Sequence, residues 1–144
     1  MIYLDHNATT PLAPEVREVM IACLTTLFGN PSSPHWVGQQ ARARVDQARG
    51  EVASAIGAAA DELIFTSGGT EANNLALLGV MRGRLAAGRR HLLVSAIEHH
   101  SVLGPAERLQ AEGFEVEHLP VGADGCVSVD RAAALLRDDT ALVS

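Results

Sequence analysis

The sequence predicts an α/β fold in which a mostly parallel sheet carries helices on both faces. Strand patterns and helix patterns alternate between about residues 63 and 143, with short links. Such alternation builds right-handed crossovers between parallel strands. With 144 residues, of which 47% are hydrophobic, the chain is long enough for one domain with a real core. Because the last strand pattern runs into residue 144, we expect the chain to be truncated at its C-terminus.

Composition argues against several classes of partner. A net charge of −6 is unfavourable for binding nucleic acid or an anionic membrane. The sequence has no run of about 18 apolar residues that could span a bilayer, and its first residues lack the layout of a signal peptide. Cys23 and Cys126 are far apart and belong to no C-x-x-C motif, which favours two reduced thiols. We therefore expect a cytoplasmic protein.

The chain contains no lysine, and its 11 basic residues are all arginines. GC-rich coding bias is sufficient to explain this composition. The chemical consequence is that no side chain of these 144 residues can form a lysine Schiff base.

Two helices are predicted in the first third of the chain. The first runs from Pro14 to about Leu27, and its apolar stripe includes Cys23 as a buried packing residue. Ser33 and Pro34 suit the cap and first turn of the second helix, which ends at Gly57. Ahead of them, Ile2–Leu4 is a short strand pattern, and His6 and Asn7 lie in a loop where solvation is favoured over a pocket.

The central stretch predicts a strand, a tight turn and a helix in direct succession. Leu63–Thr66 is the strand, and the glycines Gly68 and Gly69 can take positive φ. Thr70 can cap the helix that follows. The helix start then offers unpaired N–H groups and a positive dipole end to a phosphate. The phosphate could belong to a nucleotide, a dinucleotide or pyridoxal phosphate, although P-loop and Gly-x-Gly-x-x-Gly motifs are absent. A plain capped turn that binds no ligand is the remaining alternative.

Further elements follow in alternation. Gly88 ends the helix, and Ser101 can cap another. The remaining predictions are a strand at His91–Ser95, a helix to Gly113, a strand at Phe114–Leu119, a turn at Gly122–Gly125, a short helix capped by Asp130 and ending near Arg137, and a strand at Thr140–Val143.

A second site element follows the His91–Ser95 strand. Ligands bind beyond the carboxyl ends of parallel strands, where Glu98, His99 and His100 come next. An imidazole there could stack on a flat ring or move protons near neutral pH. Adjacent histidines diverge and no spaced third ligand accompanies them, so no metal site is expected. We favour a functional role for His99 over a histidine satisfied by loop backbone, and the reverse for His100.

Four blocks stand in order along the chain, and they are Tyr3–Pro11, Gly29–Gly38, Phe65–Asn74 and Glu98–Val102. Together they resemble the cysteine desulfurases similar to NifS and IscS, which are class V, fold-type I enzymes dependent on pyridoxal phosphate (PLP). The turn sequence is closer to the NifS/IscS branch than to the SufS branch. The resemblance implies the large PLP-binding domain, with residues 1–144 as its N-terminal segment and first part and no second domain.

The resemblance also implies residue roles. Gly69 and Thr70 match positions that bind the cofactor phosphate. His99 matches the catalytic histidine that stacks on the pyridine ring and takes part in proton transfers. The segments Asn7–Thr10 and Asn30–Ser33 resemble loops that border the active site.

The implied reaction removes sulfur from L-cysteine, giving L-alanine and an enzyme persulfide. The implied partners are a sulfur acceptor or iron–sulfur scaffold protein and, in the full-length form, a second copy in a homodimer. The family's Schiff-base lysine, its aspartate facing the pyridine nitrogen and its catalytic cysteine have no counterparts here, so we expect the chain alone to be inactive. The alternatives are a selenocysteine lyase, another class V PLP enzyme, or a non-catalytic fragment that associates with another subunit.

Overall fold

The computed structural model describes residues 2–144, which form two compact units. The N-terminal unit ends at Ile64, and the C-terminal unit runs from Phe65 to Ser144. None of the helices within residues 2–144 combines the length and the apolar character needed to cross a bilayer.

The N-terminal unit is built from two helices and a short 3₁₀ turn. Helix α1 spans Pro14–Thr26, helix α2 spans Trp36–Ile56, and η1 spans Ala60–Glu62. Proline stands in the first turn of α1, where its missing N–H is harmless. Helix α2 ends at Gly57, whose φ of 71° is the left-handed conformation that glycine adopts readily. Both predicted helices are confirmed.

Three expectations for the N-terminal unit are wrong. Ile2–Leu4 forms no strand. The cap of α2 is His35 rather than Ser33, because the His35 ring accepts a hydrogen bond from the Gly38 N–H at 3.3 Å. Cys23 is only half-buried, and no residue of α1 is buried, because nothing in this unit covers the apolar stripe of the helix.

The predicted strand at Leu63–Thr66 is also absent. Ile64 and Phe65 are 67% and 50% exposed, and the segment joins no ladder. The Leu63 carbonyl instead accepts a hydrogen bond from the Arg49 guanidinium. A run of apolar residues can become a strand only beside a partner strand, and the sheet of this structure gives this run none.

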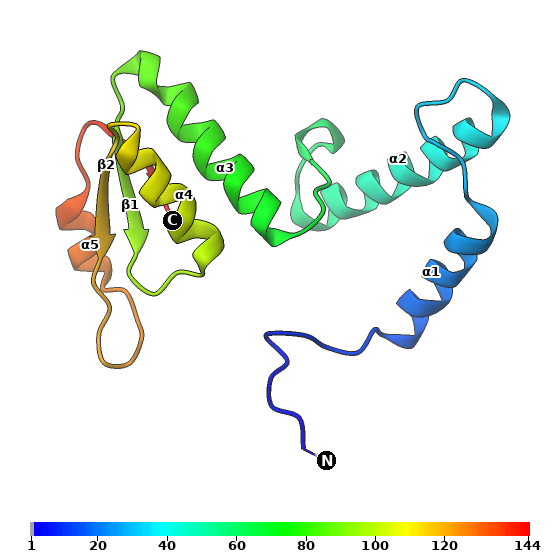
Figure 1. Ribbon diagram of the computed structural model, residues 1–144, viewed down its shortest axis with the longest axis horizontal. Helices are drawn as coiled ribbons and strands as arrows, with labels where there is room; N and C mark the ends of the chain where they lie inside the picture. Colours follow the sequence, from blue (N-terminus) through cyan, green and yellow to red (C-terminus); the bar gives the residue numbers. More distant parts are fainter. Residues whose placement is uncertain (1) are drawn as a thin grey trace. The chain divides into compact units, whose positions relative to one another are not determined.

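The C-terminal unit is a three-stranded parallel sheet with helices (Figure 1). The strand order is β2-β1-β3, so the chain moves first to one edge of the sheet and then to the other. Right-handed connections in both directions place α4 and α5 on opposite faces, as Figure 1 shows. The predicted α/β class with a parallel sheet is therefore confirmed. The elements are α3 (Gly69–Arg84), η2 (Leu85–Ala87), β1 (His91–Ser95), α4 (His100–Ala111), β2 (Glu115–Leu119), α5 (Val129–Leu135) and β3 (Thr140–Val143).

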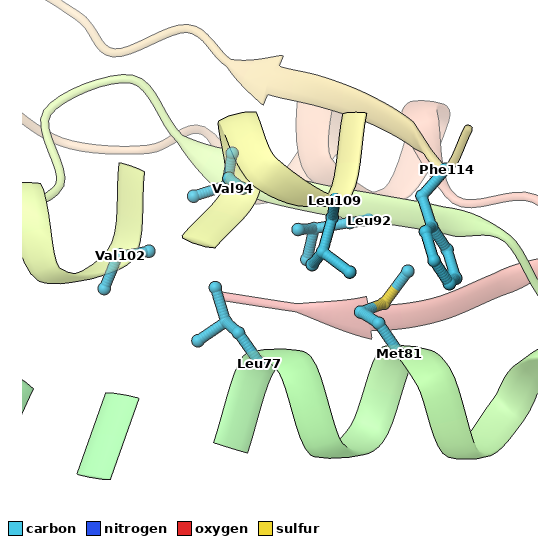
Figure 2. Packing of buried hydrophobic residues seen from close by; sticks show 8 residues of the cluster. Leu77, Met81, Leu92, Val94, Val102, Leu109 and Phe114 are labelled. Atoms are coloured by element: carbon cyan, nitrogen blue, oxygen red, sulfur yellow. The ribbon is translucent and has the colours of Figure 1, made fainter. Parts of the chain in front are cut away.

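A single apolar core holds this unit together (Figure 2). Strand β1 is buried at all five positions because it lies between β2 and β3. Helices α3 and α4 close one side of the core through Leu77, Met81 and Leu109. The packing fixes α3 against α4, and this contact positions the candidate site.

Candidate functional site

The start of helix α3 is the first part of the site. Gly68 occupies the N-cap position with φ 166° and ψ 178°, which is extended backbone, and Gly69 and Thr70 are the first two helical residues. Neither glycine adopts the left-handed conformation that was open to it, and the expected cap role of Thr70 is wrong. The cap lies two residues earlier than expected, on Gly68, which has no side chain to donate or accept.

This helix start presents backbone donors. The first intrahelical bond runs from the Ala72 N–H to the Gly68 carbonyl at 3.1 Å. The N–H groups of Gly69, Thr70 and Glu71 precede it and have no carbonyl within the helix to bond. Together with the helix dipole they make a positive end that suits an anion.

Glu71 fixes the turn in front of these donors. Its Oε2 accepts hydrogen bonds from the Ser67 N–H at 2.7 Å and from the Ser67 hydroxyl at 2.6 Å. The hydroxyl bond, and then the backbone bond, lower the pKa of Glu71. The carboxylate therefore holds the turn closed while it is ionised.

Space in front of the turn is open. A Cβ atom built on either Gly68 or Gly69 would meet no other atom within 4 Å. Neither glycine is required by a backbone strain or by a neighbouring group of this chain. The arrangement leaves room for a ligand to approach the backbone closely, which is one of the uses of glycine in phosphate-binding turns.

The start of helix α4 is the second part of the site. His99 is its N-cap, and the ring Nδ1 accepts a hydrogen bond from the Ser101 N–H at 3.1 Å. The prediction that Ser101 caps this helix is therefore wrong by two residues, because an imidazole nitrogen takes the role usually assigned to serine. The His99 ring is exposed, and His100 lies beside it with ring centroids 6.3 Å apart.

A side-chain hydrogen bond joins the two helix starts. The Asn73 amide Nδ2 donates to the Ser101 Oγ at 2.8 Å. Asn73 lies four residues after Gly69, about one helical turn of 5.4 Å, and Ser101 lies two residues after His99. The bond therefore links the helix start that carries Gly69 and Thr70 to the helix start that carries His99. His99 itself follows the carboxyl end of β1, where ligands bind in sheets of this kind.

The site residues that the sequence prediction missed are Asn73, Ser101 and Glu71. The sequence shows that Asn73 lies four residues after Gly69 and therefore on the same helix face, but this spacing does not predict a hydrogen-bond partner on another helix. The segments Asn7–Thr10 and Asn30–Ser33 belong to the N-terminal unit, and their place beside the site stays a prediction. Across residues 2–144, no three or more His, Cys, Asp or Glu side chains are grouped so that they could hold a metal ion.

Comparison with known proteins gives a consistent result. Residues 2–144 match the sequence profile of the aminotransferase class-V family. Over 143 residues the chain is 48% identical to the cysteine desulfurase IscS of Dictyoglomus turgidum, covering 99% of this chain and 36% of that protein. It is 47% identical over 146 residues to the cysteine desulfurase IscS of Proteus mirabilis, again covering 99% and 36%. The chain thus spans a little over a third of the length of these relatives.

Solved structures agree with the fold. A NifS-like protein superposes with a TM-score of 0.90 at 34% identity, covering 99% of this chain and 39% of the other. DndA from Streptomyces lividans gives a TM-score of 0.84 at 46% identity, covering 99% and 40%. SspA in complex with cysteine gives 0.88 at 37% identity, covering 98% and 40%.

Proposed function

The chain belongs to the aminotransferase class-V family, and we propose that it supplies part of the active site of a PLP-dependent cysteine desulfurase of the NifS/IscS type. The observation that carries this proposal is the Asn73–Ser101 hydrogen bond, which brings an anion-binding helix start next to an exposed histidine. A phosphate ester attached to a flat ring has the shape and charge for that pair of features. Two relatives named cysteine desulfurase and a similar structure in complex with cysteine support L-cysteine as the substrate.

The donor set fits PLP. The N–H groups of Gly69 and Thr70 and the Thr70 hydroxyl would bind its phosphate, while the Glu71 carboxylate stays bonded to Ser67. The His99 ring would stack on the pyridine face and exchange protons through Nε2, since Nδ1 is engaged with Ser101. PLP supplies an electron sink when bound.

These 144 residues do not hold every group that the reaction needs. They include no lysine, so they cannot attach PLP through a lysine side chain. Cys23 is half-buried on helix α1, and Cys126 is exposed in the loop after β2. Neither lies on the elements that form the site. We therefore expect the chain by itself to bind the cofactor without covalent attachment and to release no alanine from cysteine.

The wider assignments belong to the same proposal. The sulfur would pass as a persulfide to an acceptor or iron–sulfur scaffold protein, and the protein would act in the cytoplasm as a homodimer. A selenocysteine substrate in place of cysteine uses the same groups. A second candidate, association with another subunit without catalysis, is favoured by the lack of lysine and by the exposed apolar stripe of α1.

Cofactor binding tests the proposal directly. We would titrate the chain with 4′-deoxypyridoxine phosphate, which keeps the ring and phosphate but has no aldehyde to react with amines. We expect binding that phosphate-free 4′-deoxypyridoxine cannot reproduce, and that weakens about tenfold in Thr70→Val through loss of one charge-assisted hydrogen bond. His99→Asn should also weaken it, by removing the stacking ring.

The matched control is Thr26→Val, which removes a hydroxyl bonded only to its own helix at Ala22. Equal binding of the two analogues, or equal loss in both threonine variants, would contradict the assigned site. Alanine release above that of free PLP would show that lysine-free catalysis occurs, and would overturn the expectation of an inactive chain.

A further inference from the structure

Three side chains from two helices form a continuous hydrogen-bonded network at the site. Asn73 Nδ2 lies 2.8 Å from Ser101 Oγ, and Ser101 Oγ lies 2.9 Å from His99 Nδ1. Ser101 is 7% exposed and Asn73 is half-buried, whereas the His99 ring is exposed. The network therefore supports an exposed imidazole from its buried side.

The chemistry of the donors fixes the direction of the network. The backbone N–H of Ser101 donates to His99 Nδ1 at 3.1 Å, so Nδ1 must present a lone pair. The Ser101 hydroxyl then meets the same lone pair and must donate its proton to it. An Oγ that donates to His99 is free to accept from Asn73, and the amide Nδ2 can only donate. All the bonds run from Asn73 towards the imidazole.

We propose that Ser101 and Asn73 are positioning residues that hold His99 as the Nε2–H tautomer with its ring in one orientation. With Nδ1 occupied, Nε2–H is the ring group left to meet a ligand. A proton on Nδ1 would remove the acceptor for both the Ser101 N–H, which caps α4, and the Ser101 hydroxyl. The inference rests on the proposed function only for the identity of that ligand, since the tautomer is a property of the free chain.

Two nearly isosteric substitutions probe the direction of the network. Ser101→Ala removes the hydroxyl and leaves the backbone cap. Asn73→Asp replaces the donor by a carboxylate, which draws the Ser101 hydroxyl proton to itself and turns an oxygen lone pair towards His99 Nδ1. Asn73→Asp should therefore favour the Nδ1–H tautomer more strongly than Ser101→Ala does.

The tautomer can be read from the imidazole ¹⁵N chemical shifts of the uniformly labelled chain, with His99 identified by its loss in His99→Asn. In the wild type we expect Nε2–H to dominate. In Asn73→Asp we expect the ratio of the Nε2–H tautomer to the Nδ1–H tautomer to fall about tenfold, because the hydrogen bond between Ser101 and His99 Nδ1 reverses its direction. Ser101→Thr keeps the hydroxyl that Ser101→Ala removes, so Ser101→Thr should show the wild-type ratio of tautomers.

Asn74→Asp is the matched control, because Asn74 bonds the Thr70 carbonyl and not Ser101. An unchanged His99 tautomer in Asn73→Asp would overturn the proposal, as would an equal change in Asn74→Asp. This result is separable from the proposed function. If the chain shows the tautomer change but does not bind 4′-deoxypyridoxine phosphate, the network is supported and the cofactor assignment is wrong. If it binds the analogue without the tautomer change, the cofactor assignment is supported and the network proposal is wrong.

Discussion

The two units of the chain contain similar amphipathic helices that differ in how far their apolar faces are buried. Helices α1 and α3 both carry apolar residues at helical spacing, yet no residue of α1 is buried, whereas α3 buries Leu77 and Met81 against α4 and the sheet. Leu24 on α1 is 80% exposed, and Leu92 on β1 is fully buried. The comparison teaches that periodicity determines which face of a helix is apolar, while burial of that face depends on a partner element.

Core truncation should give the largest contrast between the units. Leu92→Ala in β1 removes a fully buried side chain and leaves a cavity in the core that the sheet shares with α3 and α4, so it should lower the free energy of unfolding by about 2–5 kcal/mol. Leu24→Ala in α1 should change it by about 0.5 kcal/mol or less. Urea unfolding followed by circular dichroism measures both. Similar losses in the two variants would mean that α1 is covered after all.

The sequence predicted most of the helices and strands. Helices α1, α2 and α3 and strands β1 and β3 lie close to where the periodicity placed them. It failed for Leu63–Thr66, because four apolar or β-prone residues look the same whether or not a neighbouring strand exists to pair with them. Local pattern therefore specified each element and its apolar face, and the pairing of elements distant in sequence decided which of them became sheet or core.

The candidate site shows a second limit of the same kind. The helix start that we propose as an anion site was predicted because glycines before a helix are a local signal. Helix caps were misassigned at four helices. His35, Gly68, His99 and Ser128 cap α2, α3, α4 and α5, in place of the predicted Ser33, Thr70, Ser101 and Asp130. Asn73 and Ser101 are 28 residues apart and meet only through the α3–α4 packing. No local pattern could have paired them.

Two left-handed glycines offer a smaller, matched contrast. Gly88 follows η2 in the C-terminal unit with φ 74°, and Gly57 ends α2 in the N-terminal unit with φ 71°. Neither has an atom within 4 Å of a built Cβ, so an alanine meets backbone strain alone. Gly88→Ala should lower the stability of the cooperative unit by about 1–2 kcal/mol.

Gly57→Ala carries the same local strain but should mainly loosen the end of α2 and leave the main unfolding transition in place. Hydrogen exchange of the β1 amides measures the first effect, and exchange of the α2 amides measures the second. Loss of β1 protection in Gly57→Ala would show that the two units unfold together.

The smallest effect concerns a salt bridge between α3 and α4. The Glu112 carboxylate bonds Arg82 on α3 at 2.6 Å and Arg108 on α4 at 3.0 Å. The Arg82 bond, followed by the Arg108 bond, lowers the pKa of Glu112 to about 2. Arg42 and Asp46 form a comparable exposed pair at 2.9 Å, but within the single helix α2.

The lowered pKa of Glu112 gives a pH dependence of known sign. Because the folded-state pKa of about 2 lies below the usual value of 4.5, the bridge stabilises the fold fully above about pH 4.5, and its contribution is lost as the pH falls through about 2. Glu112→Gln should therefore lower the urea midpoint slightly at pH 7, and the difference from wild type should vanish near pH 2. Asp46→Asn should leave the midpoint unchanged at every pH, since its pair joins nothing to the core. A pH-independent difference for Glu112→Gln would mean that the carboxylate acts through its shape, and not through the charge that ties α3 to α4.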